Sequence, residues 1–377
     1  MASTAPDSLS GAGPAPPESN ALARSYQPRR MRAAVISIAW NLVWLSAFLG
    51  SDAPEQLAEV LPRTALWVAP AYLAILFGLY ALVNLPLELW YGYLQERQFG
   101  LVKRGLRVWA RDWIVGNAQH GTMFLLGAWG ILALQHLWGA HWLLLTSGAM
   151  LVVFLATTWF GAELIPPGLF QFGRPDSLSG RRLQRLVGPQ HELPAVVLFT
   201  WADMRDFSGG LVGLGRRQML LISQAALELG SDAMLRFVLL HELGHRRYHH
   251  LLLSTLAAWG YATAGLVFCD AIIIRLAMIE LGSAIYIPWL ALFFTTWMIL
   301  GQPALAYIGR RLEYQADRFY LDHGGSLEEM RQALGELSHR DLARTDTTRR
   351  RQSLIEAVPI VARRIRAAEM HLAGRAD

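Results

Sequence analysis

The chain has 377 residues, 53% of them hydrophobic and 17% charged, and its mean hydropathy of +0.28 is high for an ordinary soluble protein. Its formal net charge is +5, but the basic residues cluster beside apolar stretches, so membrane topology explains them better than nucleic-acid binding does. Cys269 is the only cysteine, which excludes an intramolecular disulfide and a cysteine-based zinc site.

The N-terminal segment has the composition of an unstructured tail. Residues 1–23 are rich in Ala, Pro, Ser and Gly and show no apolar periodicity, so they cannot bury enough apolar surface to form a core. They also lack the apolar core of a signal peptide. We therefore predict a disordered N-terminal tail over residues 1–31, up to the arginines that precede the first apolar stretch.

A series of apolar stretches follows. A transmembrane helix needs roughly 20 mostly apolar residues, because about 30 Å must be covered at about 1.5 Å per residue. The candidate spans are 33–50, 66–85, 121–138, 142–164, 251–274 and 284–308. We expect about four helices in an N-terminal transmembrane region, residues 32–164. The other two would lie within residues 165–377, a second region that ends in cytoplasmic helices.

The basic residues predict the orientation of these helices, since Lys and Arg are retained on the cytoplasmic side of short connections. One side has Arg24, Arg29, Arg30, Arg32, Arg97, Lys103, Arg104, Arg107 and Arg111, and the other has Arg63 and Arg275. With the N-terminus inside, the segment 165–250 and the tail after residue 309 face the cytoplasm. Lysine is nearly absent beside many arginines, which suggests a GC-rich genome. We therefore expect a multi-pass protein of the bacterial inner membrane.

Between the fourth and fifth spans the composition changes to that of a small soluble α/β unit. Residues 178–186 and 224–229 are typical of short helices, and the apolar, β-branched run 195–200 is typical of a buried strand. The runs 210–215 and 219–223 predict a β-hairpin with glycine at its turn. Ser231 or Asp232 can then cap a long helix that runs through His250.

That helix carries the strongest chemical signal, His241-Glu242-Leu243-Gly244-His245. Residues four apart lie about 40° apart around a helix, one turn along it, so His241 and His245 can bind one metal ion. Glu242 is turned about 100° away and can hold a water on the open side of the metal. We expect Glu242 to take the proton of this water and to deliver it to the leaving amine.

A catalytic zinc usually takes three protein ligands and leaves the fourth position for water. Glu313 and Asp317 are carboxylates four residues apart, directly after the sixth span and on the same membrane side. We assign Glu313 to the metal, with one Zn²⁺ per chain. Asp317 is expected to accept the free ring N–H of a ligand histidine and so to fix its tautomer.

The pattern predicts a mainly α-helical, polytopic membrane protein with about six transmembrane helices and a small α/β zincin-like catalytic domain that contains a β-hairpin. Its partners would be a peptide or protein substrate and the lipid bilayer, and no nucleic acid. An extended peptide commonly pairs with an exposed strand edge, and the glycine-rich strand 209–213 offers one just before the metal helix.

Four blocks of the chain resemble the membrane metalloprotease family of type I CAAX prenyl proteases and HtpX-like proteases: 86–101, 208–227, the metal helix and 311–320. The first block contains Glu96-Arg97-Gln98-Phe99-Gly100 after an apolar span, which is similar to the CAAX-type N-terminal region and favours that branch. The resemblance implies an intramembrane zinc protease with ligands His241, His245 and Glu313, base Glu242 and supporting Asp317.

Two departures from the family pattern concern substrate binding. The family's Asn-Ala pair on the edge strand is replaced by Ser208-Gly209, with Gly210 next to it. The family's C-terminal His-Pro segment followed by Arg is represented by Val358-Pro359 and Arg364, without the histidine. We expect Ser208, Gly209, Gly210 and Arg364 to contact substrate.

Two alternatives stay open. One is a quality-control protease that cuts misfolded membrane proteins in place of prenylated C-termini. The other is a membrane scaffold or transporter with a structural metal, against which Glu242 argues, because a structural site needs no such carboxylate. Zinc content together with chelator-sensitive cleavage of a generic peptide separates the enzymes from the scaffold.

Overall fold

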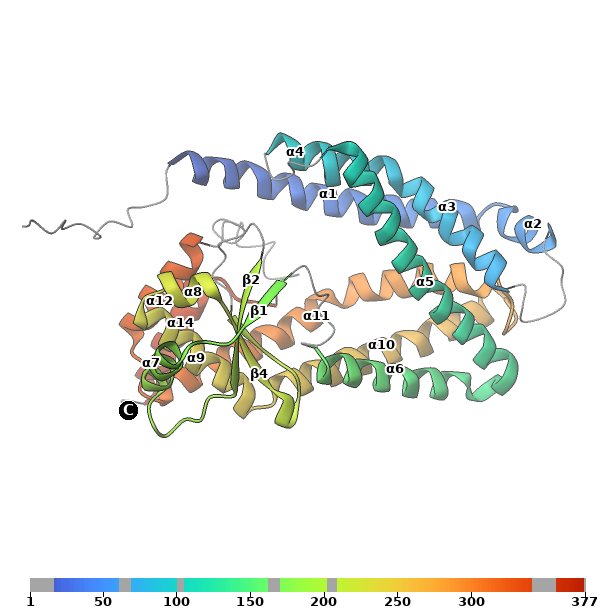
Figure 1. Cartoon of the computed structure of the whole chain (residues 1–377). Helices are drawn as coiled ribbons and strands as arrows, with labels where there is room; N and C mark the ends of the chain where they lie inside the picture. Colours follow the sequence, from blue (N-terminus) through green and yellow to red (C-terminus); the bar gives the residue numbers. More distant parts are fainter. Residues whose placement is uncertain are drawn as a thin grey trace, which may run out of the picture.

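Long helices lie side by side and carry a compact α/β unit at one end (Figure 1). The computed structural model describes residues 17–60, 69–99, 105–161, 170–201, 209–340 and 357–375. The long helices are α1 (Pro17–Leu49), α3 (Ala69–Leu89), α5 (Leu106–Trp138), α6 (Trp142–Trp159), α10 (His250–Arg275) and α11 (Tyr286–Asp322). Shorter elements link them: α2 (Ala53–Val60), η1 (Trp90–Gln95), α4 (Glu96–Gln98) and η2 (Gly139–His141).

By length and composition, five segments of the described chain can span a membrane: Met31–Leu49, Ala69–Gln98, Leu106–Trp159, His250–Arg275 and Tyr286–Asp322. The third contains both α5 and α6, which are separated at Gly139, where φ is 45°. Glycine tolerates this conformation because it has no Cβ. The protein is therefore a polytopic helical membrane protein, as the composition predicts.

The helices differ from the expected spans at their ends. Residues 17–31, expected to be disordered, belong to α1, and residues 1–16 lie outside the described part. Helix α5 begins at Leu106 instead of near residue 121. Helix α11 does not end near residue 308 but continues to Asp322. Hydropathy marks only the apolar part of a helix, so polar turns that continue it are missed.

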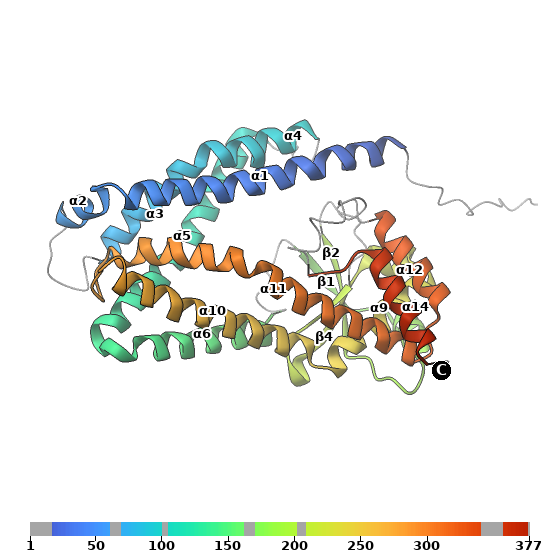
Figure 2. The ribbon, with the colours of Figure 1, turned by 180° about the vertical axis from the view of Figure 1, so that it is seen from behind.

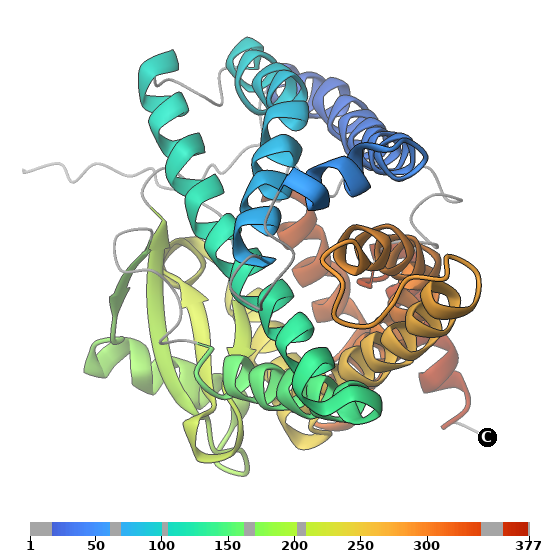
Figure 3. The ribbon, with the colours of Figure 1, turned by 90° about the vertical axis from the view of Figure 1, so that its right-hand side faces the viewer.

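Viewed along the long helices, α1 and α3 form one group, and α10 and α11 form another (Figure 3). Helix α5 crosses obliquely between α3 and α6. An apolar core in this half includes the fully buried side chains of Tyr72, Trp142 and Tyr286. The helices α1 and α3 are also joined by reciprocal hydrogen bonds of 3.0 and 3.1 Å between the side-chain amides of Asn41 and Asn84, which satisfies polar groups that lipid cannot.

The α/β unit is built on a sheet of four strands in the order β1-β2-β4-β3. The strands are β1 (Phe170–Gly173), β2 (Ala195–Trp201), β3 (Gly209–Val212) and β4 (Met219–Ser223). Strands β2 and β4 are parallel, whereas β1 pairs with β2 and β3 with β4 in antiparallel fashion. The expected strand and hairpin are thus present. Strand β3 lies at one edge of the sheet.

The helices of this unit are α7 (Ser177–Val187), η3 (Gly215–Arg217), α8 (Gln224–Leu229), α9 (Asp232–Arg247), α12 (Leu327–Arg340) and α14 (Val361–Ala373). Figure 2 shows α9 and the end of α11 among the other elements of the unit. The core contains Leu220 of β4, Leu235 and Leu239 of α9, Tyr320 of α11 and Met330 of α12, each at most 1% exposed. Burial on this scale holds α9 against both the sheet and α11.

The metal helix ends earlier than expected. Ser231 caps α9, and its Oγ accepts the amide N–H of Met234 at 3.1 Å. The helix stops at Arg247, and His249 adopts φ 53° and ψ 36° before α10 starts at His250. A left-handed residue cannot continue a right-handed helix. The expected single helix through His250 is therefore two helices with a sharp turn between them.

Candidate metal centre and active site

Three side chains bring metal-binding atoms together at the junction of α9 and α11. The Nε2 atoms of His241 and His245 lie 3.1 Å apart. Glu313 approaches both, with its Oε2 3.4 Å from His241 Nε2 and its Oε1 3.6 Å from His245 Nε2. In tetrahedral zinc sites, bonds of about 2.0–2.2 Å put ligand atoms about 3.3–3.6 Å apart. The donor set therefore has the type that zinc binds, and its spacing is close to that of a tetrahedral site.

The charge around these atoms also suits a dication. Glu313 and Asp317 contribute two carboxylates, and Arg364 contributes one guanidinium, so with neutral histidines the cluster has one excess negative charge, and a second when Glu242 is ionised. Burial lowers the pKa of His245 to about 3, which leaves its imidazole neutral. A neutral imidazole is the form that binds a metal.

His241 differs from His245 because carboxylates contact it. Burial opposes its protonation, but hydrogen bonds to Asp317 and Glu313 outweigh this effect and raise the pKa of His241 to about 9. A metal ion at Nε2 must displace this proton, as metal binding at histidine generally does.

Glu242 lies beside the three donor atoms and has a separate partner. Its Oε2 accepts the main-chain N–H of Leu211 in strand β3 at 3.0 Å. Ligand atoms of His241, Glu242 and His245 also lie within 4.8 Å of one another. Burial, with the charge of Glu313, raises the pKa of Glu242 to about 7. A carboxyl group that exchanges its proton near neutral pH is suited to act as a base and then as an acid.

Glycine at position 244 permits the close approach of α9 and α11. A Cβ there would come within 3.0 Å of both Ala316 Cα and Phe319 Cβ. Because main-chain atoms of α11 cannot easily move away, a larger residue would push the helices apart. The small pair Gly244 and Ala316 thus allows Glu313 to reach the histidines.

Asp317 and Arg364 lie behind His241. Asp317 Oδ1 is 3.0 Å from His241 Nδ1, the position that a carboxylate fixing the tautomer would occupy. Arg364 Nε donates to Asp317 Oδ2 at 2.8 Å, and its guanidinium lies 5.4 Å from the centre of the Phe237 ring. Arg364 is 8% exposed. Its guanidinium contacts Asp317, and the expectation that Arg364 also contacts substrate stays a prediction.

His250 is a member of the site that the sequence did not reveal. It is only 2% exposed, and its Nδ1 lies 2.9 Å from His245 Nδ1. Its Nε2 lies 3.2 Å from Gln315 Oε1. Since Gln315 Oε1 can only accept, His250 Nε2 donates to it, and His250 Nδ1 is left to accept the Nδ1–H of His245. This arrangement leaves His245 Nε2 free for a metal.

We expect His250→Ala to weaken zinc binding by about 10- to 100-fold, because supporting groups of ligand histidines have effects of this size. Competition with a zinc chelator on the purified chain measures this affinity. His249→Asn is the matched control, since His249 is exposed and Asn tolerates its left-handed backbone. Equal zinc affinities of the two variants would rule out a supporting role for His250.

Two of the substrate-contact residues expected on the edge strand lie in β3, in which Leu211 donates its N–H to Glu242. Gly209 and Gly210 belong to β3, and Ser208 lies outside the described residues. A Cβ at Gly209 would be 2.9 Å from Val238 Cγ1, so glycine allows β3 to lie directly on α9.

Comparison with known proteins gives two family matches. The model described as "Peptidase family M48" matches residues 202–371, which contain all of these site residues. The model described as "CAAX prenyl protease N-terminal, five membrane helices" matches residues 2–171. The chain belongs to peptidase family M48. It is of the CAAX prenyl protease type, and it is a membrane metallopeptidase.

A solved structure has the same fold. The crystal structure of S. mikatae Ste24p is similar to this M48 peptidase with a TM-score of 0.75 and 18% sequence identity, over 94% of this chain and 92% of that chain. At this identity the likeness concerns the fold alone. A search of curated proteins gave no match.

Proposed function

We propose that this M48 peptidase binds one Zn²⁺ through His241, His245 and Glu313 and hydrolyses internal peptide bonds with Glu242 as the base. The observation that carries the proposal is the triangle of His241 Nε2, His245 Nε2 and the Glu313 carboxylate, with separations of 3.1, 3.4 and 3.6 Å. These separations are close to those of three corners of a tetrahedral zinc site and leave the fourth corner for water.

The positions of these groups indicate the chemical role of each one. Bound zinc would polarise the scissile carbonyl and lower the pKa of the attacking water. Glu242 accepts the proton of this water and donates it to the departing amine. Asp317 accepts the Nδ1–H of His241, and Arg364 holds Asp317 in place. In this proposal Arg364 is a positioning residue.

The edge strand β3 supports a peptide substrate in extended form. The N–H and C=O groups of successive residues point to opposite sides of an antiparallel strand, and the N–H of Leu211 points away from β4 toward Glu242. By this alternation the N–H and C=O of Gly209 also point away from β4, whereas those of Gly210 point toward β4. We propose that a peptide pairs with the outer side of Gly209 and so passes Glu242.

We also propose that the site faces the cytoplasm of a bacterial cell, with the chain in the inner membrane. The distribution of arginine between the two sides of the spans supports this orientation. The substrate would be a peptide or protein that reaches the site from the cytosol or from the membrane.

Cleavage of a generic peptide by the purified full chain, with chelator and with zinc added back, tests the proposal. We expect cleavage that the chelator abolishes and zinc restores. A chain that retains zinc but cleaves nothing would instead be the scaffold or transporter with a structural metal. Comparison of the peptides in membranes that carry the wild type or Glu242→Gln would then distinguish a C-terminal processing enzyme from a quality-control protease.

A further inference from the structure

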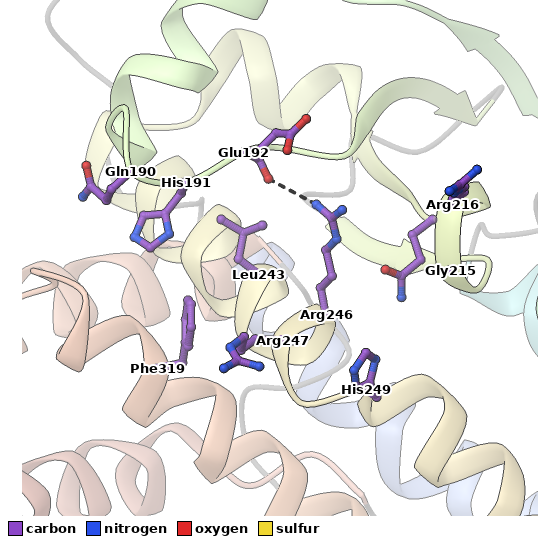
Figure 4. A pocket seen from close by; sticks show the side chains of 11 residues that line it. Gln190, His191, Glu192, Gly215, Arg216, Leu243, Arg246, Arg247, His249 and Phe319 are labelled. Atoms are coloured by element: carbon purple, nitrogen blue, oxygen red, sulfur yellow. Dashed lines mark hydrogen bonds between the residues drawn. The ribbon is translucent and has the colours of Figure 1, made fainter.

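A basic pocket lies on the side of α9 that faces away from the metal site. We use this name for the surface pocket of about 560 Å³ whose lining includes Arg216, Arg246, Arg247, His249, Leu243 and Phe319. Figure 4 shows these residues together. At about 100° per residue, the α9 positions 243, 246 and 247 lie on the opposite side of the helix from 241 and 245. The basic pocket is therefore distinct from the active site.

The arginines of the basic pocket carry charge that the described neighbours do not neutralise. Arg246 donates to the main-chain carbonyl of Glu192 at 3.2 Å, a contact drawn in Figure 4. Within the ranges that the structure describes, Arg216, Arg246 and Arg247 form no ion pair. Glu192 is the one acidic residue in the lining. Three arginines and one glutamate leave a formal charge of +2, with the histidines neutral.

The basic pocket lies at the level where two membrane helices end. His249, in its lining, immediately precedes α10, which begins at His250. On the other side, the hairpin turn at Gly215 lies against the ring of Trp159, the last residue of α6. Arg217, next to the pocket, stacks over Phe160 at 5.1 Å. Helices α6 and α10 belong to candidate spans, so a bilayer that these helices cross would have its headgroups near the basic pocket.

From the arginines without ion pairs and the position of the pocket beside the ends of α6 and α10, we infer that the basic pocket binds the phosphate of an anionic phospholipid from the adjacent leaflet. Arginine matches the geometry of phosphate oxygens and keeps its charge at an interface. Basic pockets beside transmembrane helices at a membrane surface are suited to anionic headgroups. A lipid bound here would fix the level of the β3–β4 hairpin and the start of α10 relative to the bilayer. The inference concerns lipid binding and does not depend on the proposed hydrolysis.

Native mass spectrometry of the full chain tests this inference. The protein in detergent is equilibrated with equal amounts of phosphatidylglycerol and phosphatidylcholine, and the lipids that stay bound are counted. We expect the wild type to retain phosphatidylglycerol preferentially. Arg216→Gln with Arg247→Gln should lower the affinity for this lipid by roughly 10- to 30-fold, given the contribution of each basic residue at an anionic surface. Arg246 is left unchanged because it holds the segment before β2.

Two further variants distinguish lipid binding in the basic pocket from a general effect of positive charge on the protein surface. Arg181→Gln with Arg185→Gln removes the same charge from exposed positions on α7 and should keep the preference. Arg216→Lys with Arg247→Lys keeps the charge and should retain most of the binding. The inference is wrong if the wild type shows no lipid preference or if the α7 variant loses as much as the pocket variant. It is also wrong if inorganic phosphate binds to the arginines of the pocket while phosphatidylglycerol does not, because the pocket would then be a site for free phosphate.

Discussion

Glu242→Gln is expected to keep zinc at one ion per chain while cleavage falls by at least about 10²- to 10⁴-fold, the usual contribution of general acid–base catalysis. The amide cannot accept the proton of the attacking water, but it preserves the shape of the side chain. It also keeps an oxygen that can accept the N–H of Leu211. The edge strand should therefore stay in place, so the loss would be chemical and not structural.

Zinc content and peptide turnover of the same purified preparation measure this effect. Glu228→Gln is the matched control, because Glu228 is an exposed carboxylate on the neighbouring helix α8. A metal-loaded Glu242→Gln variant with turnover near that of the control would remove Glu242 from the reaction.

Glu313→Gln should have its largest effect on metal binding. The carboxylate is the one negatively charged member of the proposed ligand set, and it approaches both histidines at 3.4 and 3.6 Å. We expect zinc affinity to fall by more than the 10- to 100-fold that loss of a supporting group costs, with activity lost in parallel. Chelator competition and metal analysis measure the change.

The control for this variant is Glu328→Gln on α12, which removes an exposed carboxylate of the same unit. Added zinc at high concentration should restore part of the activity of Glu313→Gln if the defect is metal affinity. A Glu313→Gln variant that binds zinc as tightly as the control would exclude Glu313 from the ligand set.

Local sequence predicted the parts of the site that depend on a single helix. The spacing of His241 and His245 defines one helical face, and the carboxylates of Glu313 and Asp317 define another. The hairpin and the cap at Ser231 followed from equally local signals. The metallopeptidase assignment, made from these motifs, is confirmed by the two family matches. The roles of the individual site residues stay predictions.

Features that depend on the path of the backbone were missed. A continuous helix would turn residue 250 about 140° away from residue 245, and only the left-handed conformation of His249 brings His250 to His245. Nothing in the local sequence required that turn. In the same way, the contact between Arg364 and Asp317 joins segments 47 residues apart. Such a contact arises from the packing of α14 against α11 and not from a local pattern.

Anomalous X-ray scattering at the zinc edge, from crystals of the full chain, tests the central claim most directly. We expect a single zinc peak within about 2.0–2.2 Å of His241 Nε2, His245 Nε2 and a Glu313 oxygen. Glu242 would lie beside the peak and not among its ligands. A peak bound by Glu242 in place of Glu313, or no zinc peak between the two histidines in zinc-containing crystals, would contradict it.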